Sequence, residues 1–214
     1  MLKEGGYMFL TREDLKRMFI VSSNLLKENC DEFSKIDSKF GDGDHGITIN
    51  KIADYILKEI NEWKEETSIK DFIDDLGTGI MGVNGGSAGP LWGTMISGLA
   101  CPLEDEKELS IEKVKEMFKS SLSEMQDITT AKVGDKTMMD TLIPAVKAIE
   151  DAQVESFKEL FRIGAEAAEK GAEDTKKYVS KFGRAKSYKE ETLGFKDAGA
   201  TSLACLFKGF EKSF

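Results

Sequence analysis

The chain has 214 residues, of which 40% are hydrophobic and 32% charged, and its formal net charge is −9. This composition is ordinary for a soluble globular protein, and the acidic excess argues against a nucleic-acid partner, whose phosphates need basic side chains. The sequence has no run of about 18 apolar residues and no apolar segment near its start. It therefore predicts a cytoplasmic protein without a membrane span.

Helical periodicity of the apolar residues runs through the sequence. Apolar residues recur at spacings of three and four, which places them on one face of a helix. Thr11 and Ser110 precede two of these stripes as potential caps, and Pro144 is expected to kink a third. Strand-type alternation is nearly absent. The pattern predicts eight helices, over residues 15–26, 49–60, 71–81, 91–99, 111–125, 137–150, 157–182 and 202–210.

The short connections between these helices favour antiparallel neighbours. We therefore expect an all-α fold, an eight-helix antiparallel up-and-down bundle or barrel. Glycines concentrate in four of the connections, at 41–46, 77–89, around 134 and 183–199. Alternate connections of an up-and-down bundle lie at the same end, so we expect one end to be rich in loops and to carry the function.

The segment from Asp37 to Gly46, DSKFGDGDHG, contains three carboxylates and the only histidine of the chain. Carboxylate oxygens are ligands that Mg²⁺ prefers, and glycines let a short loop bring them together. An EF-hand is excluded because no glutamate closes the loop, whereas a solvated Asp-Gly turn is the plain alternative. His45 lacks a nucleophilic partner in the sequence, so we expect it to hydrogen bond near a metal or nucleotide rather than act as a base. The segment predicts a divalent-cation site.

Three further motifs contain glycines and polar residues. Residues 82–93 precede a helix and could present backbone N–H groups to an anion, although no Walker lysine follows. In residues 134–140, Asp135 could cap a helix, and Lys136 and Thr137 could contact a phosphate or a ribose. In residues 183–200, Arg184 could clamp a phosphate or be an ordinary surface cation. None of the three decides the function by itself.

Taken together and in this order, the motifs GDGDHG, GG-x-x-GPL, GDKTM-x-D and GRA…D-x-GA-x-S resemble the nucleotide-binding L subunit of bacterial dihydroxyacetone kinase. The same unit forms a domain of single-chain, ATP-dependent dihydroxyacetone kinases. The resemblance covers nearly the whole chain, and it implies a single nucleotide-binding domain over residues 1–214. It also implies an eight-helix antiparallel barrel with the nucleotide at one end.

The resemblance implies roles for individual residues. Asp37, Asp42 and Asp44 match the aspartates that hold two Mg²⁺ ions on the phosphates of ADP or ATP. No catalytic residue is expected here, because the family binds its substrate through a histidine of a separate K subunit. The residues that match nucleotide contacts are His45, Gly46, Ile47, Thr48, Ser87, Ala88, Thr129, Thr137, Met138, Arg184, Asp197, Ala198 and Gly199.

The implied activity is that of a phosphoryl donor. The chain would pass the γ-phosphate to dihydroxyacetone, or another hydroxyketone, on the K subunit. An M-type phosphotransferase subunit would then rephosphorylate the bound ADP, ultimately from phosphoenolpyruvate. A transcription regulator and a second copy of the chain are further partners to consider.

Departures from the family pattern keep two alternatives open. Ala88 stands where serine is common, Thr129 and Thr130 replace a glycine pair, and Phe195 and Ala198 replace a histidine and a proline. With these changes the chain could be the ATP-dependent half of a kinase for another ketose. It could also be a non-catalytic, nucleotide-sensing module that binds a regulator.

Overall fold

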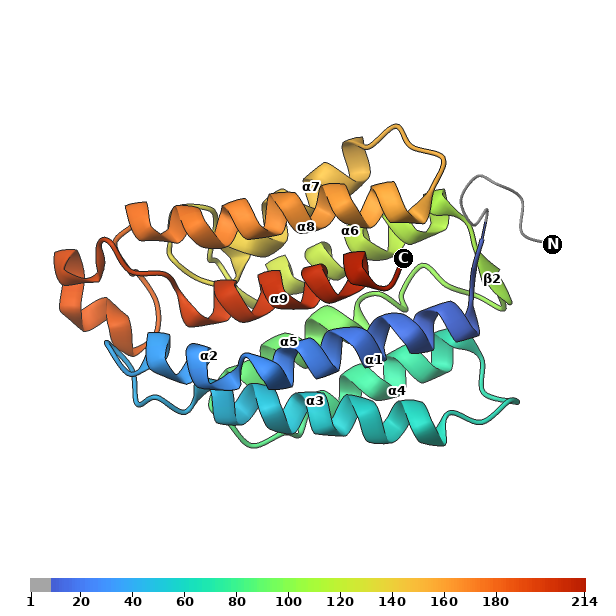
Figure 1. Ribbon diagram of the computed structural model, residues 1–214, viewed down its shortest axis with the longest axis horizontal. Helices are drawn as coiled ribbons and strands as arrows, with labels where there is room; N and C mark the ends of the chain where they lie inside the picture. Colours follow the sequence, from blue (N-terminus) through green and yellow to red (C-terminus); the bar gives the residue numbers. More distant parts are fainter. Residues whose placement is uncertain (1–8) are drawn as a thin grey trace.

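A computed structural model describes residues 9–214 as helices laid side by side along one long axis (Figure 1). The α-helices of this part are α1 (Arg12–Glu28), α2 (Cys30–Asp37), α3 (His45–Glu62), α4 (Ile69–Met81), α5 (Ala88–Ser97), α6 (Ile111–Ile128), α7 (Met139–Asp151), α8 (Phe157–Asp174) and α9 (Ala198–Lys212). Two 3-10 helices, η1 (Thr175–Lys177) and η2 (Arg184–Thr192), lie between α8 and α9. The expected all-α fold is confirmed.

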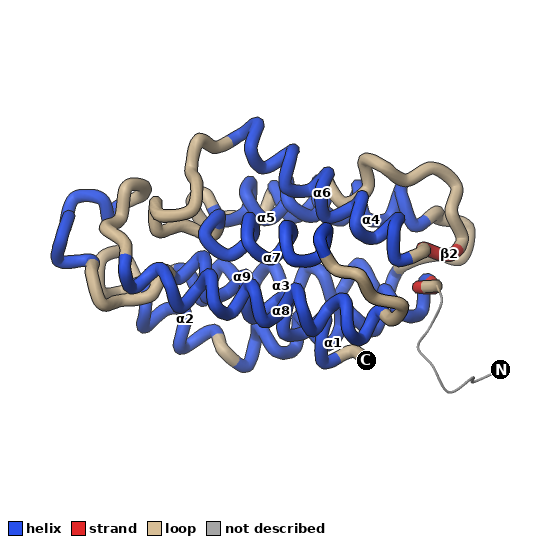
Figure 2. Tube along the Cα trace, turned by 90° about the horizontal axis from the view of Figure 1, so that it is seen from above, coloured by secondary structure: helices blue, strands red, loops and turns tan. Residues whose placement is uncertain are grey.

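The described residues contain one small sheet. Strand β1 (Leu10–Thr11) pairs antiparallel with β2 (Glu108–Leu109), so that Leu10 lies opposite Leu109. The strands lie at the end of the bundle where α1 begins (Figure 2). No helix of the described part is long and apolar enough to cross a membrane.

The helices of the structure differ from the predicted ranges in several places. The unpredicted α2 follows a break at Asn29, whose side-chain amide donates to Leu25 O at 2.8 Å and so competes with the helical ladder. Helix α8 ends at Asp174 rather than near residue 182. At this end the Thr175 hydroxyl donates to Ala172 O at 2.6 Å. Helix α9 starts at Ala198, four residues earlier than predicted, because the Asp197 carboxylate caps it.

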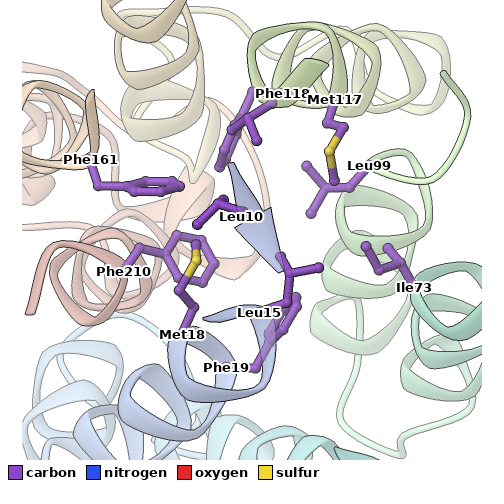
Figure 3. A pocket seen from close by; sticks show the side chains of 11 residues that line it. Leu10, Leu15, Met18, Phe19, Ile73, Leu99, Met117, Phe118, Phe161 and Phe210 are labelled. Atoms are coloured by element: carbon purple, nitrogen blue, oxygen red, sulfur yellow. The ribbon is translucent and has the colours of Figure 1, made fainter. Parts of the chain in front are cut away.

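One continuous apolar core joins the helices. Toward the end where α1 begins, side chains from β1, α1, α6, α8 and α9 point toward one another (Figure 3). Phe161 and Phe210 meet there at a ring-centroid distance of 5.9 Å, and Phe118 lies 6.2 Å from Phe161. Aromatic pairs at these distances add to the stabilisation that burial of their area provides.

The helices alternate in direction along the bundle, as an up-and-down fold requires (Figure 1). The N-termini of α3, α5, α7 and α9 therefore lie at one end, which we call the loop end. The N-termini of α1, α4, α6 and α8 lie at the other, which we call the far end. The four glycine-bearing stretches share the loop end, as the sequence predicted.

Helices α4 and α5 cross closely through glycines, and this crossing fixes the connection between them at the loop end. A Cβ atom on Gly93 would lie 2.6 Å from both Gly77 O and Met81 N. Real Cβ contacts are longer, and backbone atoms of packed helices cannot move aside cheaply. Glycine is therefore required at Gly93 for packing.

We predict that Gly93→Ala destabilises the protein. Overpacking costs about 1–3 kcal/mol, and better helix propensity returns at most about 1 kcal/mol. The measurement is urea unfolding followed by circular dichroism. Gly164→Ala is the matched control, because the nearest atoms to a Cβ there belong to side chains, Ile149 at 2.8 and 3.0 Å and Phe207 at 3.7 Å, and not to the backbone. Equal stability of both variants would contradict the packing role of Gly93.

Candidate metal and nucleotide site

The acidic loop, residues 37–46, brings its three carboxylates together. Asp37 ends α2, Asp42 lies in the connection, and Asp44 precedes α3; one oxygen of each lies within 4.8 Å of the others. Gly43 has φ +75°, and its N–H donates to Asp37 Oδ2 at 2.8 Å. A Cβ on Gly41 would collide with the Asp37 carboxylate. The glycines therefore allow a tight loop in which repelling carboxylates face a common point, which suits a divalent cation.

Arg184 lies at this loop. Its guanidinium pairs with the Asp42 carboxylate, although both side chains are largely exposed. Arg184 is the first residue of η2, so the pair connects the segment before α9 to the acidic loop. Both sequence interpretations of Arg184, a phosphate clamp and an ordinary surface cation, are compatible with this exposed position beside the acidic loop.

An aromatic cluster holds the same two segments together. The Phe40 ring lies 5.2 Å from Tyr188 and 5.3 Å from Phe195, and the Lys39 ammonium is 4.2 Å from the Phe195 ring centroid. Sequence reasoning missed this cluster, noting Phe195 only as a departure from a family pattern. Residues 155 positions apart in sequence give no periodic signal of contact, so the cluster could not be found from spacing.

The glycine-rich connection between α4 and α5 packs against the start of α3. A Cβ on Gly85 would collide with the Thr48 side chain, and Lys51 Nζ donates to Asn84 O at 3.3 Å. Thr48 is buried by this contact, whereas Ser87 is exposed at the start of α5 with Ala88 beside it. The structure thus places Ser87, rather than Thr48, where a ligand could reach its side chain.

The two ends of the bundle differ in how their helices begin. At the far end all four helices receive a side-chain cap, from Thr11, Ser68, Ser110 and Ser156. At the loop end the residues before α3, α5 and α7, which are Asp44, Ser87 and Met138, make no such bond. Aspartate and serine are good caps, so their side chains are free for another partner. Uncapped helix N-termini favour anions.

His45 faces inward from the first turn of α3. Its Nε2 lies 2.9 Å from Ser202 Oγ on α9, and burial lowers its pKa, so the imidazole is neutral near pH 7. Gly46 follows it, and a Cβ there would collide with Cys30 O of α2. Ile47, by contrast, is 58% exposed. His45 and Gly46 therefore fix the start of α3 against its neighbours.

The 134–140 loop is organised by a residue to which the sequence analysis gave no role. Asp140 is buried, and its two oxygens accept from Gly134 N at 2.6 Å and Thr137 N at 2.7 Å. Burial raises the pKa of the Asp140 carboxyl in spite of these bonds. Asp135 does not cap α7 but accepts from Lys181 Nζ at 2.6 Å. The signal was present in the sequence, since Asp140 lies three residues after Thr137, at capping-box spacing.

Lys136 does not face a ligand. It is only 4% exposed, and its ammonium donates to Thr175 O at 2.7 Å and to Phe195 O. Burial lowers its pKa, while the Asp197 and Asp140 carboxylates favour its charged form. The sequence-based expectation that Lys136 could contact a phosphate or a ribose is therefore not supported by its position.

The start of α9 lies beside the start of α7. A Cβ on Gly199 would lie 3.6 Å from Met138 Cβ, and Thr141 Oγ1 donates to Ala200 O at 3.0 Å. Ala198 and Met138 are buried, and Thr137 is half-buried.

Thr129 lies at the end of α6. Its hydroxyl accepts from Ala131 N at 3.2 Å. This is a local bond, and it does not connect Thr129 to the acidic loop.

The ionised form of Asp197 is disfavoured by its surroundings at the loop end. Burial raises the pKa of its carboxyl to about 6, and the Asp140 and Asp37 carboxylates add to the effect. The hydrogen bond from Ala200 N, at 2.8 Å, and the charge of Lys136 oppose the shift without cancelling it. Ionised Asp197 is therefore a cost to the folded state.

We predict that Asp197→Asn stabilises the protein in a pH-dependent way when measured without metal. Asparagine caps a helix as well as aspartate does. Well below pH 4 the Asp197 carboxyl is protonated in both states, so the variant and the wild type should unfold alike. As the pH rises through the unfolded value toward about 6, the unfolded chain loses the proton first, and the advantage of the variant grows to at most about 3 kcal/mol above pH 6. Urea unfolding from about pH 3 to 8 tests this, and a pH-independent difference would contradict it.

Comparison with known proteins gives related sequences of two lengths. L-erythrulose kinase of Pectobacterium atrosepticum is 30% identical over 187 residues, which cover 86% of this chain and 32% of that protein. The ADP-binding subunit of PEP-dependent dihydroxyacetone kinase 2 of Listeria innocua is 28% identical over 180 residues, 83% of each chain. The chain thus spans about a third of one relative and most of the other.

A solved structure shares the fold. The dihydroxyacetone kinase from C. freundii in complex with AMP-PNP and Mg²⁺ has a TM-score of 0.73 at 22% identity, covering 100% of this chain and 36% of that one. The family model described as the DAK2 domain matches residues 39–212, which include the acidic loop from Lys39 onward and all three other motifs. This chain therefore belongs to the DAK2 domain family, and its resemblance to the nucleotide-binding subunit of dihydroxyacetone kinases is confirmed.

Proposed function

We propose that this chain is the phosphoryl-donor unit of a hydroxyketone kinase and holds Mg²⁺ with ADP or ATP at the loop end. The observation that carries the proposal is the convergence of the Asp37, Asp42 and Asp44 carboxylates within 4.8 Å. They lie at the end of the bundle where helix N-termini lack side-chain caps. A cation site beside anion-favouring helix ends suits a metal-bound polyphosphate.

The donor set fits Mg²⁺. Asp37, Asp42 and Asp44 would hold two ions, which supply charge neutralisation to the phosphates during transfer. The Arg184 guanidinium pairs with one of these carboxylates, so the loop already has one cationic partner. Three carboxylates leave most coordination positions of two ions to phosphate oxygens and water, so we expect the nucleotide to strengthen metal binding.

We assign the nucleotide-binding residues to two groups. The first group contacts the ligand: exposed Ser87 and half-buried Ala88 through the start of α5, Arg184 through its charge, and Ile47 through its apolar surface. The buried or locally bonded group shapes the site. Its members are His45, Gly46, Thr48, Thr129, Thr137, Met138, Asp197, Ala198 and Gly199.

The acceptor substrate must come from another chain. In the family, hydroxyketones are bound through a histidine, and the only histidine here is engaged with Ser202. We propose a K-type subunit as the partner that presents the substrate. Val133, Tyr188 and Leu193 are between 42% and 48% exposed at the loop end and give it an apolar rim for docking.

The regeneration of the donor is the second part of the proposal. The Listeria relative is named as a subunit of a PEP-dependent kinase, which favours an M-type subunit that rephosphorylates ADP in place. The Pectobacterium relative, a longer chain named as an L-erythrulose kinase, favours a different arrangement, the ATP-dependent half of a kinase for another ketose. A nucleotide-sensing module that binds a transcription regulator is a third arrangement, and it would bind nucleotide without transferring phosphate.

We predict that Asp42→Asn abolishes Mg²⁺-nucleotide binding but leaves the fold intact. The affinity should fall by more than about 100-fold, beyond the loss that an outer-shell partner causes, because Asp42 would contact the metal itself. Calorimetric titration with Mg²⁺-ADP measures the affinity, and circular dichroism monitors the helices. Asp74→Asn, an exposed change on α4, is the control and should bind like the wild type. Full binding by the Asp42 variant would exclude this metal site.

We predict phosphoryl transfer to dihydroxyacetone when the chain is combined with K-type and M-type subunits and phosphoenolpyruvate. ADP that remains bound through purification, seen by native mass spectrometry, would support this route. Transfer from ATP without an M-type subunit would favour the ATP-dependent alternative, with erythrulose as the first ketose to compare. If the chain binds nucleotide but transfers no phosphoryl group in either mixture, the result would favour the non-catalytic sensing module.

A further inference from the structure

The chain between η1 and α9 forms a closed loop, residues 176–194. Gly194 N donates to Lys176 O at 2.8 Å, and just outside this pair Asp197 N donates to Thr175 Oγ1 at 3.0 Å. The chain therefore leaves the bundle and returns at one point, as compact surface loops do. In Figure 1 this segment protrudes beyond the other helices at the loop end.

Lys136 lies at the base of this 176–194 loop. Its ammonium donates to Thr175 O at 2.7 Å on one side and to Phe195 O on the other. Lys136 has φ +61°, a conformation that costs free energy for a residue with a side chain, and it is 4% exposed. Lysine is almost never buried so fully without compensation. A strained, buried lysine that joins both ends of a loop indicates a positioning role.

Lys136 joins the 176–194 loop to the 134–140 loop, and each of these loops contains a residue proposed to bind or shape the nucleotide site. The 176–194 loop contains Arg184, which pairs with Asp42 of the metal set. On the other side, Lys136 directly precedes Thr137 and Met138, and Met138 lies beside Gly199. The charges that face the ammonium are the Asp140 and Asp197 carboxylates, one from α7 and one from the start of α9. The Lys136 ammonium thus connects the metal side of the site to the side next to α7 and α9, and it does so from a buried position.

We propose that Lys136 is the positioning residue that couples the 176–194 loop to the 134–140 loop, so that bound Mg²⁺-nucleotide is released only when both move. This inference rests on the proposed function, since it assigns a role toward the same nucleotide. Lys136 does not contact the ligand. Its effect is to fix the distance between Arg184 and the Thr137–Met138 backbone through two carbonyls.

The test compares Lys136→Met with Lys181→Met in the full-length chain. Lys181 also joins the two loops, through Asp135 at 2.6 Å, but its own side chain is 57% exposed. The backbone bond from Lys181 N to Asp135 O, at 3.1 Å, remains when that side chain is replaced, so the variant keeps a connection at this point. Methionine fills the space of Lys136 but leaves both carbonyls without their donor. We expect Lys136→Met to release Mg²⁺-ADP at least about fivefold faster in stopped-flow chase experiments, the scale of a typical coupling between sites. Lys181→Met should release it at the wild-type rate.

A second readout is independent of nucleotide. Arg184, Lys186 and Lys189 are exposed trypsin sites in the 176–194 loop. Limited trypsin digestion should cut Lys136→Met in this loop several times faster than the control, with the fragments identified by mass. A lysine that only stabilises the fold would lower the unfolding temperature without changing the release rate or the cleavage pattern of the folded protein.

The outcomes separate this inference from the proposed function. Failure of the wild type to bind Mg²⁺-ADP would overturn both. Binding by the wild type, with equal release rates from both variants, would overturn only the role of Lys136. If Lys136→Met does not fold, hydrogen exchange of the wild type decides: the amides of Gly194 and Thr137 should gain protection together when Mg²⁺-ADP binds. Protection of one without the other would overturn the coupling.

Discussion

The alternating direction of the helices is the constraint on which the site depends. Because neighbours run antiparallel, the partial positive ends of α3, α5, α7 and α9 gather at the loop end, and the negative ends of the others lie between them. Thr11, Ser68, Ser110 and Ser156 satisfy the helix starts at the far end. The loop end lacks most such caps, and this difference gives one end of an otherwise symmetrical bundle its capacity for anions.

Negative charge at the loop end is held in place by a few specific contacts. The acidic loop depends on glycines and on Arg184, while the interior depends on Lys136 between Asp140 and Asp197. Both arrangements set like charges close together and leave the balance incomplete, since burial raises the pKa of Asp197 to about 6. Selection for stability alone would not retain a buried carboxyl like that of Asp197. The unbalanced charge is consistent with a site that is completed by a cation and its ligand.

The aromatic cluster around Phe40 distinguishes this chain from the family pattern. Phe195 stands where a histidine is usual, and in the structure its ring packs on Phe40 and under the Lys39 ammonium. The Phe40 ring thus makes apolar contacts with Tyr188 inside the 176–194 loop and with Phe195 directly after it. Since apolar contact does not depend on protonation, the closure of this loop should be insensitive to pH near neutrality, unlike one that relies on a histidine.

The sequence by itself determined the all-α fold, the sharing of one end by four glycine-bearing loops, and the convergence of three carboxylates in the acidic loop. Helical periodicity, short connections and ligand chemistry are local properties, and they can be read along the chain. Only the tertiary structure decided that Lys136 is buried, that His45 is bound to Ser202, and that α8 ends at Asp174. These features depend on contacts between residues far apart in sequence, whose side chains have no pattern that spacing could reveal.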